Sequence, residues 1–230
     1  MLKAVIFDMD GVIVDSEPLH HKAYQKMFSD FDLEVSNTLY ESFTGQATQT
    51  ICETLCTTFK LDIEASVLVN RKRKHFYRLF DEDQEFQLIT GVLDLIKDYH
   101  YSGLKLVLAS SASMQNINRI FSRFNLDPYF VAKLSGAELK ASKPHPEIFI
   151  KATEATGLLK ENCFVIEDST NGIKAAKSAG LFCVAFDSPN SKNQDYSEAD
   201  LTIQSFEDIQ YSKIILKFSS KKITPQNTRI

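Results

Sequence analysis

Ala4-Val-Ile-Phe-Asp-Met-Asp-Gly-Val-Ile-Val-Asp-Ser-Glu17 is the stretch around which the rest of the chain is organised. Its first four residues are continuously apolar and too few for a helix, which predicts a strand buried on both faces. Asp8 falls where this strand should end. Residues two apart in an extended chain point the same way, so Asp8 and Asp10 are expected to share one site. Gly11 then allows the backbone to turn sharply.

The two carboxylates of this stretch require a partner if they lie close together. At a separation of about 4 Å they would repel by roughly 4 kcal/mol at an effective dielectric constant of 20. A cation or a shared proton would offset this repulsion. The alternative is that Asp8 and Asp10 only end a strand and begin a turn, because Asp and Gly are ordinary turn residues. The pattern Asp-x-Asp-Gly by itself leaves both interpretations open.

The composition is that of an ordinary globular protein, with 43% hydrophobic and 24% charged residues. A chain of 230 residues can hold one large core with a smaller inserted unit. The net charge of -4 gives no reason to expect a nucleic acid or an anionic membrane as partner. We find no signal-peptide core and no long apolar stretch, and the four cysteines lack Cys-x-x-Cys spacing. We therefore expect free thiols and a cytoplasmic location.

The segment that follows the first strand is helical throughout. Ser16 is expected to cap a first helix, in which apolar residues recur at helical spacing as far as Phe28. Further helical patterns cover Thr38–Phe43, Ala47–Phe59 and Ile63–Phe80. No strand pattern interrupts them, so residues 16–85 are predicted to form an inserted helical bundle.

From Gly91 onward, strand and helix patterns alternate, which indicates a parallel sheet flanked by helices and an α/β fold. A polar loop is expected at Asp187–Asp200 and a frayed tail at Ser219–Ile230. The expected strands are Leu104–Ala109, Tyr129–Leu134, Cys163–Ile166, Leu181–Phe186 and Leu201–Ile203. The expected helices are Val92–Tyr101, one from Ser113 to about Phe124, Glu147–Thr156, and one from Ser169 to Ala179.

Polar residues collect at the predicted carboxyl ends of the strands, where open parallel sheets bind ligands. The residues expected to converge there are Asp8, Asp10, Ser110, Lys143, Glu167 and Asp168.

These residues also form four motifs that resemble the haloacid dehalogenase-like superfamily of phosphohydrolases. The resemblance is to the branch with a helical cap, which includes beta-phosphoglucomutase, phosphoglycolate phosphatase and sugar-phosphate phosphatases. It implies a Rossmann-like catalytic core of residues 1–15 and 86–230, with helices on both faces, and a cap of residues 16–85. The motifs are Asp8-Met-Asp-Gly-Val12, Ser110 after an apolar strand, Lys143-Pro-His-Pro-Glu147, and Glu167-Asp168-Ser169.

The resemblance implies a division of labour between the two leading acids. Asp8 would be the nucleophile that accepts the phosphoryl group, and Asp10 the general acid and base. A Mg²⁺ ion would be held by Asp8, Asp168 and the backbone carbonyl of Asp10, with Glu167 as a ligand or a neighbour of the ligands. Asp10 also separates this chain from the dehalogenases of the family, because a halide leaving group needs no proton.

The resemblance further implies that Ser110, the backbone N–H of Ser111 and the ammonium of Lys143 bind the phosphate. In the cap, Glu17, His20 and Gly45 are the candidate substrate residues.

Three departures from beta-phosphoglucomutase favour hydrolysis over phosphate retention. A mutase must bind phosphate at both ends of its substrate, and this needs a cation from the cap. Thr48 stands where the mutase has an arginine, and Ser113 and Met114 stand where it has a lysine and an asparagine.

The basic run Arg71–Lys74 spreads around a helix, so most of it should face solvent, while one or two members face the site.

The sequence thus predicts a Mg²⁺-dependent phosphatase for a small phosphorylated metabolite, a sugar or polyol phosphate. The alternatives are a phosphosugar mutase and a non-enzymatic regulatory subunit. A monomer or weak oligomer is expected, with a cap that closes about hinges near Val14–Ser16 and Phe86–Thr90.

Overall fold

The computed structural model describes residues 1–187, 191 and 193–220. Within them, a parallel sheet of six strands has the order β3-β2-β1-β4-β5-β6. The chain runs outward from β1 to β3, then returns to the other side of β1 and runs outward again. The carboxyl end of β1 is therefore a topological switch point, where open sheets bind ligands. The strands are β1 (Ala4–Phe7), β2 (Lys105–Ser110), β3 (Phe130–Ser135), β4 (Cys163–Glu167), β5 (Phe182–Phe186) and β6 (Leu201–Ile203).

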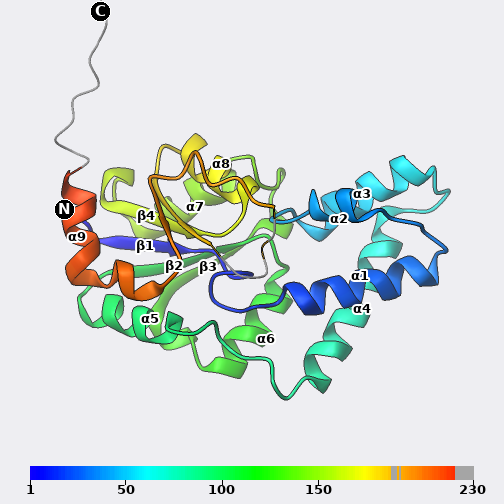
Figure 1. Ribbon diagram of the computed structural model, residues 1–230, viewed down its shortest axis with the longest axis horizontal. Helices are drawn as coiled ribbons and strands as arrows, with labels where there is room; N and C mark the ends of the chain where they lie inside the picture. Colours follow the sequence, from blue (N-terminus) through cyan, green and yellow to red (C-terminus); the bar gives the residue numbers. More distant parts are fainter. Residues whose placement is uncertain (188–190, 192, 221–230) are drawn as a thin grey trace, which may run out of the picture.

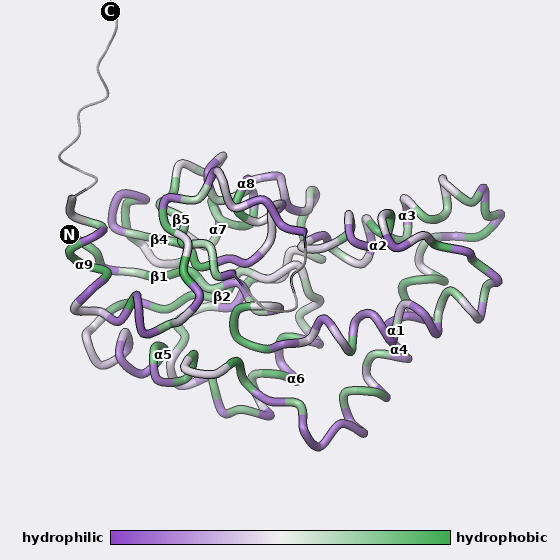
Figure 2. The backbone as a smooth tube through the Cα atoms, viewed as in Figure 1, coloured by the Kyte–Doolittle hydropathy of each residue, from purple (hydrophilic) through white to green (hydrophobic). Residues whose placement is uncertain are grey.

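The central strand is buried on both faces, as its continuous apolar run predicts. Val5 and Phe7 pack into the hydrophobic core on one face, while Ala4 and Ile6 pack into the core on the other. This alternation follows from the two-residue period of a strand. Apolar colour in Figure 2 accordingly follows the strands and the loop after β1.

Helices cover both faces of the sheet (Figure 1). The helices α5 (Val92–Tyr101), α6 (Met114–Phe124) and α9 (Tyr211–Ser220) contribute to the core that contains Phe7. The helices α7 (Glu147–Thr156) and α8 (Thr170–Ser178) contribute to the opposite core.

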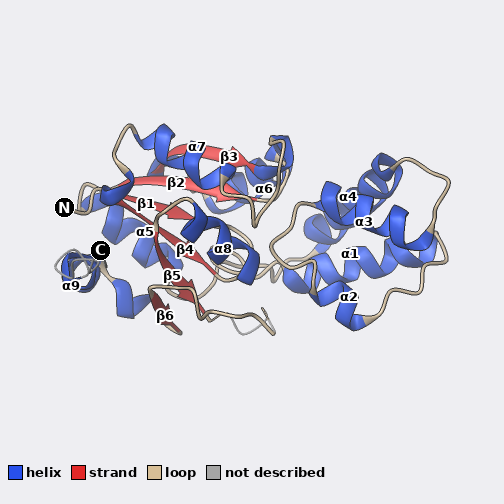
Figure 3. Ribbon diagram, turned by 90° about the horizontal axis from the view of Figure 1, so that it is seen from above, coloured by secondary structure: helices blue, strands red, loops and turns tan. Residues whose placement is uncertain are grey.

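Four helices form a separate bundle beyond the carboxyl ends of the strands (Figure 3). They are α1 (Glu17–Asp30), α2 (Asn37–Glu41), α3 (Thr48–Phe59) and α4 (Ala65–Glu82). The bundle has its own core, in which Met27, Leu55 and Leu68 are fully buried. The predicted α/β fold with an inserted helical cap is confirmed.

One local expectation was wrong, and one helix was not anticipated. Ser16 precedes α1, but its hydroxyl makes no capping hydrogen bond and donates to Asp10 instead. The helix α9 was not predicted, although Ile214 and Phe218 lie one turn apart and are buried against the sheet. The expected tail therefore overlaps the end of α9, and residues 221–230 lie outside the described part of the chain, as do 188–190 and 192 of the expected polar loop.

The four cysteines are free, and three of them are buried, as expected. In the part of the chain that the structure describes, we find no helix with the length and apolar character to span a membrane.

Candidate active site

The turn after β1 places the first two acids and leaves no room for a side chain at Gly11. The backbone N–H of Asp8 continues the strand pairing by donating to the carbonyl oxygen of Ile166, at 3.0 Å. Gly11 has φ +83°, and a Cβ there would lie 1.9 Å from Oδ2 of Asp168. Glycine is required at this position, because the turn must bring the end of β1 against the end of β4.

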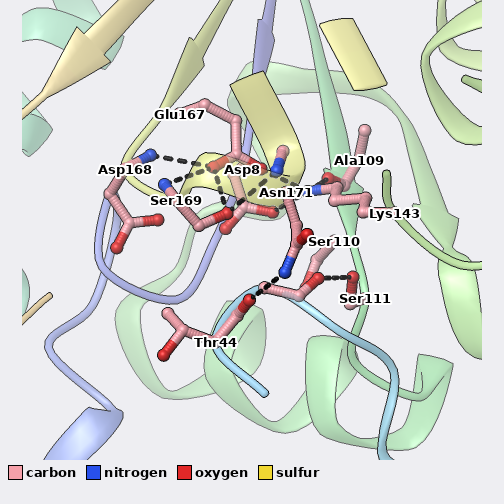
Figure 4. A network of polar contacts seen from close by, with 12 residues as sticks. Asp8, Thr44, Ala109, Ser110, Ser111, Lys143, Glu167, Asp168, Ser169 and Asn171 are labelled. Carbon is pink, nitrogen blue, oxygen red and sulfur yellow. Dashed lines mark hydrogen bonds and ion pairs between the residues drawn. The ribbon is translucent and has the colours of Figure 1, made fainter. Parts of the chain in front are cut away.

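Lys143 is buried at the centre of the site (Figure 4). Its ammonium donates to Oδ1 of Asp8 at 2.5 Å, to Oε1 of Glu167 at 2.6 Å and to the carbonyl oxygen of Ala109 at 3.2 Å. Burial opposes the charged ammonium, but the two carboxylates outweigh it and raise the pKa of Lys143 above its usual range. Lys143 therefore holds the ends of β1, β2 and β4 together.

Both carboxylate oxygens of Glu167 have partners within the chain. Oε1 accepts from Lys143, and Oε2 accepts from the backbone N–H groups of Asp168 at 2.8 Å and Ser169 at 2.9 Å. A Cβ at Gly172 would lie only 1.7 Å from Oε1, so the first turn of α8 must pass close over this carboxylate. Glu167 thereby ties Lys143 to the start of α8.

Asp8, Glu167 and Asp168 form a buried acidic cluster whose ligand atoms lie within 4.8 Å of one another. Burial raises the pKa of Asp8 to about 7; Lys143 opposes this rise and the charge of Glu167 adds to it. Burial and the neighbouring carboxylates also raise the pKa of Asp168. Lys143 offsets only one of three negative charges. A cluster of carboxylate oxygens with excess negative charge suits a hard divalent cation such as Mg²⁺.

Asp10 lies at the junction with the cap. Its Oδ1 accepts a hydrogen bond from Ser16 and lies 3.5 Å from Nε2 of His20. Burial would raise the pKa of Asp10, but these contacts outweigh it and lower the pKa below its ordinary value. On the other side of the ring, Nδ1 of His20 lies 2.6 Å from Nζ of Lys72. An ammonium only donates, so Nδ1 accepts and Nε2 carries the proton that faces Asp10.

The loop before α3 is held over the site by two core side chains (Figure 4). Ser111 donates to the carbonyl oxygen of Gly45, and Asn171 donates to that of Thr44, each at 2.8 Å. A Cβ at Gly45, where φ is +79°, would lie 2.4 Å from Oγ of Ser169. The cap and the core therefore meet in a closed arrangement.

A partly open cavity of about 90 Å³ lies between core and cap. Seven of the ten predicted site residues line it: Asp8, Asp10, Glu17, His20, Gly45, Ser111 and Asp168. The other three, Ser110, Lys143 and Glu167, lie buried at the ends of β2 and β4 and on the loop before α7, and two of them contact each other. The lining residues that sequence reasoning did not single out include Tyr24, Tyr40, Thr44, Gln46, Ile51 and Ser191.

Lys72 is the member of the basic run that faces this cavity. It is 3% exposed, and burial lowers its pKa to about 8. Arg71 and Lys74 are exposed, so the expectation that most of the run faces solvent is correct. The sequence carried a signal for Lys72, because it lies three or four residues from the apolar Leu68, Val69 and Phe76 on one helix face. Lys72 on α4 therefore gives the cap a cation that the loop before α3 lacks.

Comparison with known proteins agrees with this geometry. Residues 5–186 match the family model described as haloacid dehalogenase-like hydrolase. A phosphorylated carbohydrates phosphatase of Thermotoga maritima is 30% identical over 184 residues, which cover 78% of this chain and 82% of that protein. A beta-phosphoglucomutase of Bacillus subtilis is 29% identical over 213 residues, covering 90% of this chain and 92% of that protein.

A solved structure of beta-phosphoglucomutase from Clostridium difficile has the same fold. Its TM-score is 0.85 at 24% identity, and the match covers 97% of this chain and 100% of that one. The expectation of an enzyme is also confirmed. Since the family model spans most of the chain and its motif residues meet around one buried acidic site, this protein belongs to the haloacid dehalogenase-like hydrolases.

Proposed function

We propose that this protein is a Mg²⁺-dependent phosphatase that hydrolyses a sugar or polyol phosphate through a phosphoryl group carried on Asp8. The observation that carries the proposal is the position of Asp8, which lines the cavity while Lys143 holds its Oδ1. Oδ2 is then the oxygen presented to the substrate. A carboxylate nucleophile divides the displacement into two easier steps.

In the first step, Oδ2 of Asp8 forms a bond to phosphorus while the bond to the substrate oxygen breaks. Asp10 is ionised in the free protein, so it takes a proton from the bound phosphate monoester and passes it to that oxygen, and the alcohol leaves. In the second step Asp10 takes a proton from water, whose oxygen attacks phosphorus and releases Asp8 and inorganic phosphate. The proton on Nε2 of His20 and the hydroxyl of Ser16 hold Asp10 in place for both transfers.

The cation would be held by Asp8, Asp168 and the backbone carbonyl of Asp10, and when bound it would neutralise charge on the phosphate oxygens. Glu167 already uses both oxygens within the chain, so its role is to position Lys143 and Asp168. For the phosphate, we assign the Ser110 hydroxyl and the Ser111 N–H as donors, with Lys143 contributing its charge from behind Asp8.

A phosphosugar mutase is the second candidate, and Lys72 favours it because it places a cation in the cap wall. Two relatives of similar identity point in different directions, since one is a phosphatase and the other a mutase. We keep hydrolysis first because the Glu17 carboxyl lies in the same wall and opposes a second phosphate. The regulatory subunit is disfavoured because every motif residue is in place.

The first prediction tests hydrolysis directly. Purified protein with Mg²⁺ is expected to release inorganic phosphate from at least one of a panel of sugar and polyol monophosphates, and chelation of the metal is expected to stop release. Colorimetric phosphate assay measures the release, and chromatography of the products detects isomers. An isomeric sugar phosphate without net phosphate release would establish the mutase instead. If neither inorganic phosphate nor an isomer forms, both candidate functions are excluded.

We also propose that residues 16–85 move as a cap, since cap and core residues together line the cavity that receives the substrate. Closing forms the hydrogen bond from Asn171 to the carbonyl oxygen of Thr44. The hinge near Phe86 is held by Arg123 of α6, which donates to the carbonyl oxygens of Asp83 at 2.6 Å and Phe86 at 3.1 Å. The cap would turn about this fixed point.

The second prediction concerns closure. Asn171→Ala is expected to raise KM by about three- to tenfold, because one uncharged hydrogen bond contributes about 1 kcal/mol to the closed state. Steady-state kinetics on the best substrate of the panel measures the change. Asn118→Ala is the matched control, because Asn118 is exposed on α6 and accepts from Lys133 rather than bonding the cap. If the two variants have equal KM values, the hydrogen bond of Asn171 does not contribute to cap closure.

A further inference from the structure

We propose that Thr50 of the cap is a positioning residue for the reaction. Its hydroxyl meets that of Ser142 in the core, and this contact holds the loop that carries Lys143 while the cap is closed. The inference rests on the proposed phosphatase activity and adds to it a residue outside the cavity wall. Among the described residues that line the cavity, α3 contributes Thr48 and Ile51 and not Thr50.

The contact between the two hydroxyls is the first observation. Oγ1 of Thr50 and Oγ of Ser142 lie 3.0 Å apart, and both residues are half-buried. Either hydroxyl can donate and the other accept. Ser142 directly precedes Lys143, whose ammonium donates to the nucleophile Asp8. One hydrogen bond therefore joins the cap to the residue beside the buried lysine.

The loop around Lys143 has few other polar anchors. Among the described residues, the other hydrogen bonds of residues 140–146 close turns within the loop or reach the first turn of α7. The backbone N–H of His145 donates to the carbonyl oxygen of Ser142 at 3.0 Å, and that of Glu147 donates to Nδ1 of His145 at 3.3 Å. Hydrogen bonds thus fix the loop to the body of the protein from two sides, through the Lys143 ammonium and through the Ser142 hydroxyl.

The contact also differs in kind from the neighbouring links between cap and core. Ser111 and Asn171 bond the same part of the cap, but each donates to a backbone carbonyl oxygen, which any residue type supplies. The link between Thr50 and Ser142 depends on two side chains. It can therefore be removed by substitution while the other two links stay in place.

The contact exists only while the cap covers the core, because Thr50 belongs to one unit and Ser142 to the other. Lys143 holds Oδ1 of Asp8 and so directs the other oxygen of the nucleophile into the cavity. A small misplacement of a group that orients a nucleophile lowers the rate of the chemical step. Loss of the Thr50 hydroxyl should therefore lower kcat, whereas loss of the Asn171 link should raise KM.

Kinetics on the best substrate of the panel test this difference. Thr50→Val removes the hydroxyl and keeps the branched shape, and it is expected to lower kcat by about fivefold, the effect of one uncharged hydrogen bond, with KM within twofold. Thr50→Ser, which keeps the hydroxyl, should retain the wild-type kcat. Thr54→Val is the matched control, because Thr54 is exposed on the same helix and its hydroxyl donates to the carbonyl oxygen of Thr50.

Ser142→Ala tests the contact from the core side. It is expected to lower kcat by the same factor as Thr50→Val, and the double variant should show no further loss, because both substitutions remove one shared interaction. Thermal unfolding of each variant checks the fold.

Amide hydrogen exchange gives a readout that does not depend on turnover. Inorganic phosphate with Mg²⁺ is expected to slow exchange in wild-type peptides that cover residues 40–47 and 140–147. In Thr50→Val, protection of residues 40–47 should remain, because Ser111 and Asn171 still bond the cap. Protection of residues 140–147 should fall to the level of the ligand-free protein.

The outcomes separate the two proposals. The role of Thr50 is refuted, while the phosphatase stands, if Thr50→Val has the kcat of Thr54→Val, if only KM changes, or if the losses of the two single variants add. Equal protection of residues 140–147 in wild type and Thr50→Val would refute it as well. If wild-type protein hydrolyses no phosphoester of the panel, acetyl phosphate included, the phosphatase fails and the role of Thr50 in its reaction fails too.

Discussion

Asp8→Asn is expected to lower kcat by about 10⁴-fold or more while the protein stays folded. An amide is a far poorer nucleophile than a carboxylate, and loss of a covalent nucleophile removes the step that divides the reaction. The replacement has nearly the same shape, and its amide oxygen can still accept from Lys143, which lies 2.5 Å from Oδ1 in the native protein. The loss should therefore appear in turnover and not in stability.

Initial rates with a saturating polyol phosphate measure this effect, with far-ultraviolet circular dichroism and thermal unfolding as the test of the fold. Asp94→Asn is the matched control, because Asp94 is exposed in the first turn of α5. Activity of Asp8→Asn near that of the wild type would exclude Asp8 as the nucleophile. A folded variant that binds substrate without turning it over would place the loss in the chemical step.

Lys143→Met is expected to have the second largest effect, on stability as well as activity. The side chains of Asp8 and Glu167 are 8% and 1% exposed, and Lys143 is the cation that both of them contact. Removing one partner of a buried ion pair leaves uncompensated charge and costs about 3–5 kcal/mol. Since a typical domain is stable by only about 5–15 kcal/mol, this is a large share of the total.

Urea unfolding at neutral pH measures the loss as a lower midpoint at an unchanged slope. The control is Lys140→Met, which removes an exposed lysine from the same loop. Turnover should fall with the stability, because Lys143 orients the nucleophile and Glu167 together. A midpoint equal to that of Lys140→Met would show that the buried carboxylates do not depend on this lysine for their charge.

Much of the fold could be predicted because its elements carry strong local patterns. The continuous apolar run of β1 requires burial on two faces, and the alternating segments after Gly91 require a parallel sheet. The helix α9 was missed because it follows a segment with strand and turn signals and its apolar face is only two turns long. A short periodic pattern predicts a helix weakly until the surface that it covers is known.

The residues of the candidate site also fall into those that local sequence patterns predict and those that they do not. Asp8, Asp10 and Asp168 were predictable, because acids that follow buried strands must meet at the carboxyl edge of a parallel sheet. The sequence also predicted that one or two members of the basic run would face the site, but not that Lys72 is the one that does. Helical spacing places a residue on a face, but only the packing of one helix against another decides which part of that face meets a cavity.

The sequence by itself therefore determined the fold class, the family and the acids at the end of β1, because each depends on neighbours within a few residues or on a fixed sheet geometry. Only the tertiary structure decided which cap side chains lie next to Asp10, and that the Lys143 ammonium donates to Asp8, Glu167 and Ala109. Those facts depend on distances between segments far apart in the chain, and local periodicity carries no information about such distances.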